Sequence, residues 1–232
     1  MTLDGSKRSR KTRKNARFSE EDGAKRASSK DVRKPKKARP LDETTLRDLA
    51  LSYVARFATT GSKLEGYLAR KLRERGVAED ADGRVQTPDV HALVTRLIEL
   101  GYVDDEAYAR SKTRDLTARG YGARRVEQAL WAAGVDENTR EETAPNEAET
   151  RRAAILLAKK RRFGPFARHL DEGEPADALR KRRDKQVAAM LRAGHRFEHI
   201  AFILDARNEC DIDEWLIEAE DEAENEKGPN SW

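Results

Sequence analysis

Glycines interrupt a helical pattern of apolar residues at several points along the middle of this 232-residue chain. The most informative interruption is Gly101–Glu106, where a glycine that can end one helix is followed by acidic residues that can cap the next. A second interruption, 119–125, contains two more glycines. Because stops and starts alternate in this way, the sequence predicts an all-α fold built from short helices.

The first predicted group of helices lies between residues 44 and 103. Its first helix carries apolar residues at i, i+3, i+4, i+7, i+8 and i+11, which draw one apolar stripe: Leu46, Leu49, Ala50, Tyr53, Val54 and Phe57. Ser62 and Glu65 predict a capping box for a second helix that stops at Gly76. After a polar loop, Thr87-Pro88 predicts the start of a third helix that runs to Gly101.

The same arrangement recurs twice. Asp104, Gly122 and Asp136 are placed to start the three helices of a second group. A third group runs from about Glu147 to Arg162, resumes near Leu179, and ends with a helix over 197–204. The stops at Gly76, Gly134 and Gly194 are 58 and 60 residues apart. This spacing predicts three tandem three-helix repeats in an elongated, curved array.

The predicted domains follow from these boundaries. They are a disordered basic tail over 1–43, three repeats over 44–103, 104–145 and 146–205, and an acidic C-terminal extension over 206–232.

The two ends of the chain carry opposite charge. Residues 1–40 hold fifteen Lys and Arg against five Asp and Glu, and residues 205–232 hold two against eleven. The basic end has few large apolar residues, so it either attracts phosphates through nonspecific charge or serves only as a solubilising tail. In the acidic end, helical spacing predicts one more helix, fraying beyond Ala223, with apolar residues Ile212, Trp215, Leu216 and Ala219.

Residues that would indicate an enzyme or a metal site are sparse. His195 and His199 are one helical turn apart, but no third ligand accompanies them and the lone cysteine, Cys210, lies in the acidic end. Gly120-Tyr121-Gly122 lacks the third glycine of a nucleotide-binding loop. We therefore expect no catalytic residues, no metal and no cofactor. With one cysteine and no long apolar run, we expect a cytoplasmic protein.

Two surfaces are candidates for binding a partner. Helical spacing places Arg124, Gln128 and Trp131 together on the outside of one helix, a composition that is typical of protein interfaces. The alternative is that Trp131 packs against a neighbouring repeat. Lys159–Arg162 is the densest basic cluster of the predicted repeats, although a helix C-terminus alone also favours such residues.

These residues resemble the RecX family of bacterial recombination regulators over roughly residues 44–205. The most specific match is Leu97–Ala109, followed by Gly120–Val126 and the stop from Leu130 to Gly134. Ala123 departs from the proline that often follows Gly-Tyr-Gly in the family, which affects only how sharply the helix begins.

The resemblance implies a monomeric protein that binds the RecA filament on single-stranded DNA and inhibits its recombinase, ATPase and co-protease activities. Contact with the DNA itself is expected to be indirect or weak, and no membrane contact is expected. Tyr121 is expected to order the junction between repeats. The candidate binding residues are Arg70, Arg73, Arg119, Tyr121, Arg124, Arg125, Trp131, Lys159, Lys160, Arg161 and Arg162.

Two other functions remain open from the residues alone. The chain is either a stand-alone nucleic-acid-binding helical module, which the basic clusters permit, or a helical adaptor that does not act on RecA. Nucleic-acid binding by charge should weaken steeply with salt, whereas a protein interface with apolar anchors should persist better.

Overall fold

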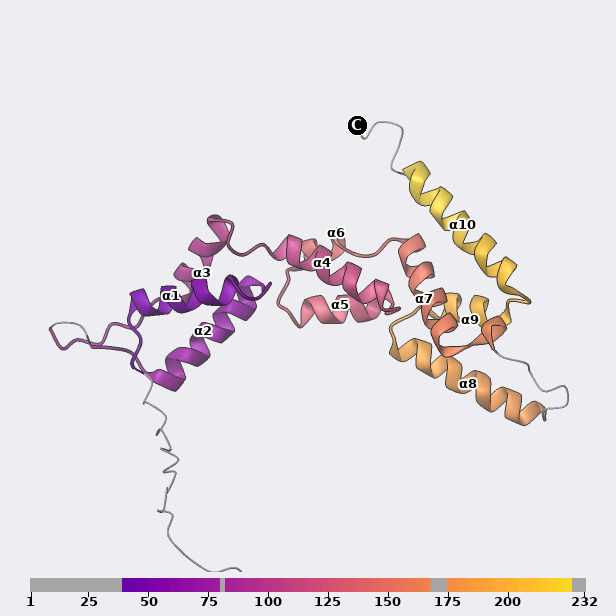
Figure 1. Cartoon of the computed structure of the whole chain (residues 1–232), viewed down its shortest axis with the longest axis horizontal. Helices are drawn as coiled ribbons and strands as arrows, with labels where there is room; N and C mark the ends of the chain where they lie inside the picture. Colours follow the sequence, from indigo (N-terminus) through magenta and orange to yellow (C-terminus); the bar gives the residue numbers. More distant parts are fainter. Residues whose placement is uncertain (1–38, 80–81, 168–174, 227–232) are drawn as a thin grey trace, which may run out of the picture. The chain divides into compact units, whose positions relative to one another are not determined.

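The computed structural model describes residues 39–79, 82–167 and 175–226. Within these ranges, regular structure consists of ten α-helices and one short 3-10 helix, and strand pairing is limited to two isolated bridges. The prediction of an all-α fold is confirmed (Figure 1). Almost all of the predicted basic tail lies outside the described residues.

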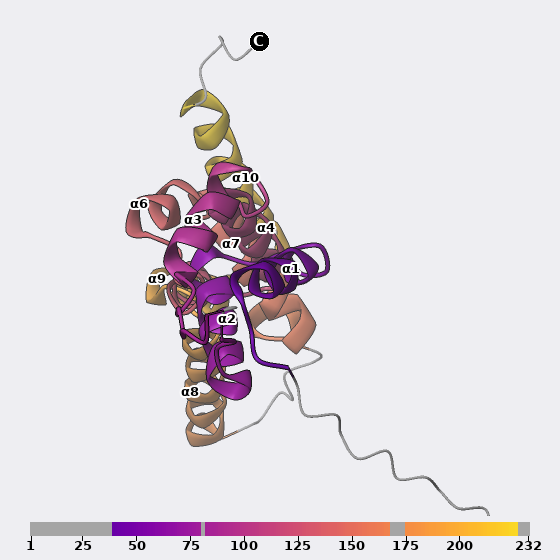
Figure 2. The ribbon, with the colours of Figure 1, turned by 90° about the vertical axis from the view of Figure 1, so that its left-hand side faces the viewer.

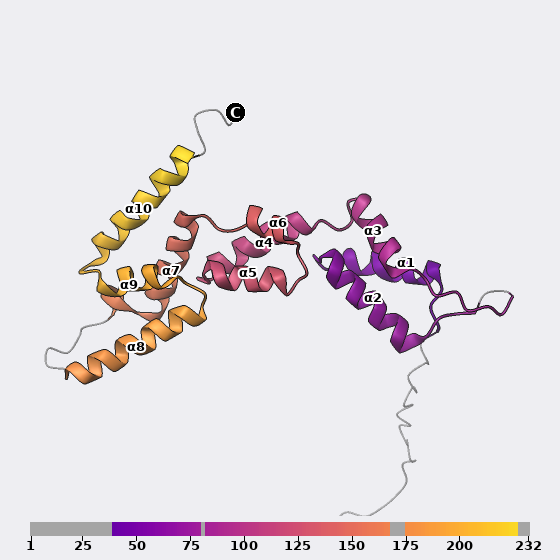
Figure 3. The same ribbon diagram turned by 180° about the vertical axis from the view of Figure 1, so that it is seen from behind.

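The first three helices, α1 (Glu43–Val54), α2 (Gly61–Arg75) and α3 (Val90–Glu99), share one apolar core. Its buried residues come from all three helices and from both flanking loops: Leu41, Leu46, Ala50, Leu64, Leu68, Val94, Leu97 and Val103. Figure 3 shows this group from behind, with α2 crossing below α1 and α3. Of the apolar stripe predicted for the first helix, Leu46 and Ala50 are buried in this core, whereas Phe57 is exposed.

Two predicted helix starts in this group were wrong. The N-cap of α2 is Thr60, whose hydroxyl accepts a hydrogen bond from the backbone N of Lys63, so Ser62 is already inside the helix. The N-cap of α3 is Asp89, whose carboxylate accepts from the backbone N of Ala92. In both places the sequence offers two neighbouring cap residues, and the one that caps lies two positions from the one predicted.

The second group consists of α4 (Asp105–Ala118), α5 (Ala123–Trp131) and α6 (Glu137–Glu142). Asp104 and Asp136 cap α4 and α6 through their side chains, and Gly122 precedes α5, as predicted. A small apolar core holds these helices together: Ala109, Leu116, Val126, Leu130, Ala133 and Val135.

The third group begins with α7 (Glu147–Arg161), which ends before a 3-10 turn, η1 (Gly164–Phe166). It continues with α8 (Ala176–Arg192) and α9 (Phe197–Asp205). The core buries one face of α7 and α9, and Met190 of α8.

The last helix, α10 (Glu209–Glu226), belongs to this third core. Ile212, Trp215 and Ala219 are buried at the predicted helical spacing, and α10 packs along α7. The helix runs three residues past Ala223, the predicted start of fraying. The two longest helices of the described chain are α8 and α10, with 17 and 18 residues. Figure 2 shows the chain from the side, with α10 at the top of the view and α8 at the bottom.

These three cores support the proposal that residues 44–103, 104–145 and 146–205 are separate three-helix units, with α10 completing the third. Their assembly into an elongated, curved array stays a prediction. The first and second groups touch where α2 begins. There, the Thr60 hydroxyl donates to the carbonyl of Ala133 at 2.5 Å, and the backbone N of Gly61 donates to the carboxylate of Asp105 at 2.9 Å.

Among the described helices, none combines the length and the apolar character that crossing a lipid bilayer requires.

Candidate functional site

A hollow of about 380 Å³ lies where the C-terminal ends of α4, α7 and α8 meet. Four cationic side chains line it, and three of them, Arg119, Lys160 and Arg161, were predicted as candidate binding residues. Tyr121, a fourth predicted residue, lies beside them with its ring partly exposed. The remaining lining groups are Gly120, Leu157, Phe163, Ala189, Arg192 and Ala193. We call this surface the basic hollow.

The cations of the basic hollow differ in how far they are neutralised. Arg119 forms an ion pair with Asp115 at 2.8 Å, and the amine of Lys160 donates to the backbone carbonyl of Arg119 at 3.3 Å. Within the described part of the chain, Arg161 and Arg192 have no carboxylate at ion-pairing distance. Sequence reasoning missed Arg192, because only the tertiary packing of α8 brings it to α4 and α7.

Helix ends alone do not account for this excess of positive charge. A helix C-terminus carries about half a negative charge, so basic residues are favourable there. Three such ends and the Asp115 carboxylate still fall short of cancelling four full positive charges. The basic hollow is therefore an electropositive site with a partly apolar lining.

One wall of the basic hollow is fixed by a close backbone junction between the loops before α5 and α9. The backbone N of Gly122 donates to the carbonyl of Ala193 at 2.9 Å, and that of Arg124 donates to the carbonyl of Gly194 at 3.2 Å. Tyr121 was expected to order this junction. The contacts that the structure shows come instead from its glycine neighbours and from a buried histidine, His195.

His195 joins the two loops through its side chain. Its Nε2 lies 3.0 Å from the carbonyl O of Gly120. Since a carbonyl can only accept, Nε2 carries the proton, and the buried Nδ1 has no hydrogen-bond partner in the described residues. Burial lowers the pKa of His195, with the Gly120 hydrogen bond opposing this effect in part. The ring is therefore neutral at pH 7.

A second candidate surface follows α5. Trp131 is 69% exposed, so the alternative that it packs against a neighbouring repeat does not hold for the described residues. At 3.6 residues per turn, Trp131 shares an exposed stripe with Arg124 and Gln128, as predicted, and with Glu127. A hollow of about 230 Å³ opens beside this stripe, and it is lined by Ala123, Arg124, Val126, Glu127, Leu130, Arg140, Ala144, Pro145 and Arg196. We call Trp131 and this lining the α5 surface.

Two of the three arginines on the α5 surface are already paired. Arg140 donates from Nε to Glu127 at 2.7 Å and from Nη1 to the carbonyl of Val135 at 2.6 Å. Arg196 lies 3.5 Å from a carboxylate oxygen of Glu147. No described carboxylate pairs with Arg124. Arg124 and Trp131 are therefore the side chains on this surface that remain available to a partner.

The other predicted residues line neither of these two hollows. Lys159 lies over the ring of Phe166, 5.3 Å from its centre. Arg162 ends α7 with a left-handed backbone, φ 58°. Arg125 is exposed on α5, with its backbone against Gly194. On α2, Arg70 lies 3.7 Å from Glu74, and Arg73 is exposed.

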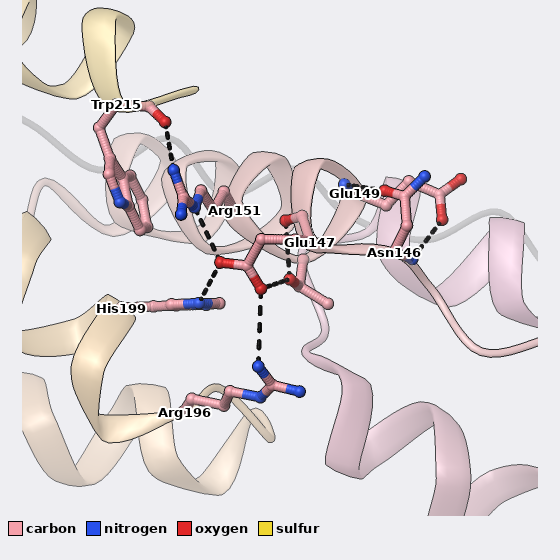
Figure 4. Close-up of polar contacts among 8 residues, drawn as sticks. Asn146, Glu147, Glu149, Arg151, Arg196, His199 and Trp215 are labelled. Carbon is pink, nitrogen blue, oxygen red and sulfur yellow. Dashed lines mark hydrogen bonds and ion pairs between the residues drawn. The ribbon is translucent and has the colours of Figure 1, made fainter. Parts of the chain in front are cut away.

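The strongest polar network of the third group centres on Glu147 (Figure 4). One oxygen of this carboxylate accepts from Nε of Arg151 at 2.8 Å and faces Nε2 of His199 at 2.9 Å. Arg151 also donates to the backbone carbonyl of Trp215 at 2.6 Å and stacks over its ring. Sequence reasoning missed this network, because its members come from three helices.

The charge states of Glu147 and His199 suit a structural role for this network. Burial would raise the pKa of Glu147, but the hydrogen bond from Arg151 and the neighbouring positive charge lower it overall. Burial lowers the pKa of His199, against the attraction of Glu147. We take the carboxylate as charged and the imidazole as a neutral donor, because Arg151 already neutralises Glu147. The network joins α7, α9 and α10.

The two histidines that could have suggested a metal site face different partners. His195 contacts Gly120, and His199 contacts Glu147. In the described ranges, no three His, Cys, Asp or Glu side chains gather closely enough to hold a metal ion.

The largest of the hollows described, about 790 Å³, lies between α1, α3 and the loop before α3. Two of its carboxylates, Asp42 and Asp89, already cap the helices that follow them. Its remaining lining mixes both signs of charge: Arg47 and Arg96 are lining residues, and so are Glu43 and Glu79. This hollow gives no clear preference for a ligand.

Comparison with known proteins places these features in a family. The family model described as RecX, second three-helix domain, matches residues 104–143, which span α4 to α6. Regulatory protein RecX of Myxococcus xanthus is 32% identical over 181 residues, covering 76% of this chain and 93% of that protein. Regulatory protein RecX of Leuconostoc citreum is 28% identical over 182 residues, covering 77% of this chain and 58% of that protein.

Two solved structures share the fold. RecX from Lactobacillus salivarius matches with a TM-score of 0.52 at 21% identity, over 70% of this chain and 96% of that one. A second crystal structure, of regulatory protein RecX, matches with a TM-score of 0.51 at 21% identity, over 71% and 72% of the two chains. At this identity the structural likeness supports the helical fold alone.

Proposed function

The chain belongs to the RecX family of regulatory proteins, and from this premise we propose that it binds the RecA filament on single-stranded DNA and inhibits its recombinase, ATPase and co-protease activities. The proposed partner is the filament, and the proposed active form is a monomer. The proposed site of action is the cytoplasm.

The observation that carries this proposal is the α5 surface. It presents Trp131, 69% exposed, and Arg124, which lacks a carboxylate partner in the described residues, beside an apolar hollow. Tryptophan and arginine dominate the binding energy of many protein interfaces, since tryptophan offers a large rigid contact area and arginine offers several hydrogen-bond donors in a planar fork. A hollow of about 230 Å³ is suited to receive a large apolar side chain of a partner.

The surface requires little rearrangement to bind. Val126 and Leu130 anchor α5 in the second core, and the backbone N of Arg124 is bonded to the carbonyl of Gly194. A side chain on a fixed helix loses less freedom on binding than one on a loop. On α2, which is anchored in the first core in the same way, Arg70 already has a carboxylate partner in Glu74.

The test is a titration of the purified chain into RecA on single-stranded DNA while ATP turnover is followed. We expect turnover to fall to a low plateau. The variant Arg124→Ala/Trp131→Ala should need at least about thirtyfold more protein for half-inhibition, because a single hot-spot residue contributes about 2 kcal/mol or more.

The matched control is Arg56→Ala/Phe57→Ala, which removes an exposed arginine and an exposed aromatic ring outside the α5 surface. This control should inhibit as the unaltered chain does. Unchanged ATP turnover at saturating wild-type chain would refute the function. Equal inhibition by both variants would refute the assignment to the α5 surface.

A further inference from the structure

The basic hollow combines charge and apolar area in a way that neither helix ends nor core packing requires. Arg161 and Arg192 reach it from different helices, without a carboxylate partner in the described ranges. The amine of Lys160 donates one hydrogen bond to the carbonyl of Arg119 and has two further N–H donors. Several N–H groups thus remain free to bind oxygen atoms of an anionic ligand.

The apolar and aromatic residues that line the basic hollow indicate which groups the ligand carries besides its negative charge. Leu157 and Phe163 line the hollow together with the cations, and Tyr121, which also lines it, is 38% exposed. A nucleic-acid strand supplies one phosphate and one flat base in every residue. In a single strand the base faces are free to stack on aromatic side chains, whereas in a duplex they stack on one another.

We propose that the basic hollow binds single-stranded nucleic acid directly, with Arg161, Arg192 and Lys160 on the phosphodiester backbone and Tyr121 stacking on a base. This inference goes beyond the proposed function, because it requires no RecA. The α5 surface and the basic hollow then perform separate tasks: one docks protein and the other holds the strand.

The geometry favours a nucleic acid over an acidic peptide as the occupant. Carboxylates would satisfy the arginines equally well, but a nucleic acid supplies a flat base for Tyr121 beside every phosphate, whereas an acidic peptide has no such regular pairing of charge and ring. Stacking on Tyr121 should be insensitive to salt, while the phosphate contacts should weaken as salt rises.

The test uses the full chain and a fluorescent oligo-dT, with binding followed by anisotropy across a range of salt concentrations. We expect Arg161→Gln/Arg192→Gln to weaken binding about tenfold and to make the slope of log K against log salt shallower by roughly 1.4, since each phosphate contact on a single strand contributes about 0.7. The matched control is Arg56→Gln/Arg114→Gln, which removes two exposed arginines outside the hollow. The control should retain wild-type affinity and slope.

The aromatic contact is tested separately. Tyr121→Leu should weaken oligo-dT binding roughly tenfold, and Tyr121→Phe should restore it, because stacking requires the ring and not the hydroxyl. Helical circular dichroism of each variant checks that it is folded. On the unaltered chain, crosslinking to an iodouracil-containing oligonucleotide should recover the peptide that contains Tyr121.

Several results would overturn the inference. Equal loss in the hollow variant and in its control would assign the binding to general charge, including that of the basic N-terminal residues present in all variants. Equal affinity for duplex DNA, or full competition by polyglutamate at matched charge, would exclude a single-strand site. Crosslinks that omit the peptide containing Tyr121 would place the strand elsewhere.

Discussion

At the junction between the loops before α5 and α9, the backbone packs so closely around Gly122 that no larger residue fits there. Gly122 has an ordinary backbone, φ −81°, so its need for glycine is one of space. A Cβ at this position would stand 2.6 Å from the backbone N of His195, and still closer to the carbonyl of Gly194. Backbone atoms cannot move aside as a flexible side chain can.

We therefore predict that Gly122→Ala destabilises the protein by about 1–3 kcal/mol or more, the range for inserting atoms into a filled site. The measurement is urea unfolding followed by helical circular dichroism. Gly66→Ala is the control, because a Cβ on this mid-helix glycine meets nothing within 4 Å. The control should gain up to about 1 kcal/mol, since alanine favours a helix. Equal stability of the two variants would show that the junction is looser than described.

His195 at the same junction predicts a dependence of stability on pH. Burial holds its folded pKa below 6.5, so below that pH the unfolded chain takes up a proton that the folded chain resists. Stability should be complete above about pH 7 and should fall as the pH drops through 6.5 towards the lowered folded value.

The measurement is the melting temperature of wild type and of His195→Gln between pH 8 and pH 5.5. Wild type should lose stability over this window more steeply than the variant, which has no proton to gain at this position. Parallel slopes for wild type and His195→Gln would contradict a neutral, buried His195.

Among the helices, α10 combines an acidic exposed face with an apolar buried one. Trp215 lies on the buried face, stacked on Phe202 at 4.5 Å and covered by the guanidinium of Arg151. Without α10, the helices α7 and α9 would expose apolar residues of the third core. The acidic C-terminal segment therefore contributes to the third core as well as to the charge of the chain.

We predict that Trp215→Ala lowers the free energy of unfolding by about 3–5 kcal/mol, as expected for removing a large aromatic side chain from a core. Ile217→Ala on the same helix is the control, because Ile217 is 53% exposed and its loss should cost well under 1 kcal/mol. Denaturant unfolding of both variants provides the comparison. A small effect at Trp215 would mean that α10 is only loosely attached.

The helices were predictable from the sequence because the interactions that begin and end them join residues only a few positions apart. Asp104 caps α4 and Asp136 caps α6 with hydrogen bonds to residues three positions away, and the glycine stops need only their own backbone. Thr60 was missed as a cap. Its hydroxyl also bonds to Ala133, 73 residues away, and that contact is invisible in a local pattern.

The candidate surfaces were predictable only in part, for the same reason. Helical spacing placed Arg124 and Trp131 on one exposed stripe, which requires knowledge of α5 alone. The basic hollow needs three helix ends to meet, so its member Arg192 could not be identified from spacing. The Glu147 network, with His199 and Arg151, depends on tertiary packing in the same way.

For the chain as a whole, the account separates a protein-docking surface on α5 from an anion-binding hollow at the ends of α4, α7 and α8. A contact anchored by Trp131 should depend only weakly on ionic strength, because burial of apolar area is not screened by salt. Binding through charge alone should be lost as salt rises. Salt dependence therefore distinguishes a RecA regulator from a stand-alone nucleic-acid-binding module.

The most direct measurement is cosedimentation of the chain with RecA filaments, assembled on single-stranded DNA and held by a non-hydrolysable ATP analogue, at low and at moderate salt. The account predicts that wild-type chain pellets with the filaments at both salt concentrations, and that Arg124→Ala/Trp131→Ala stays largely in the supernatant at moderate salt, where binding through charge is weakened. Wild-type chain that remains in the supernatant, or that pellets equally with DNA alone at moderate salt, would contradict it.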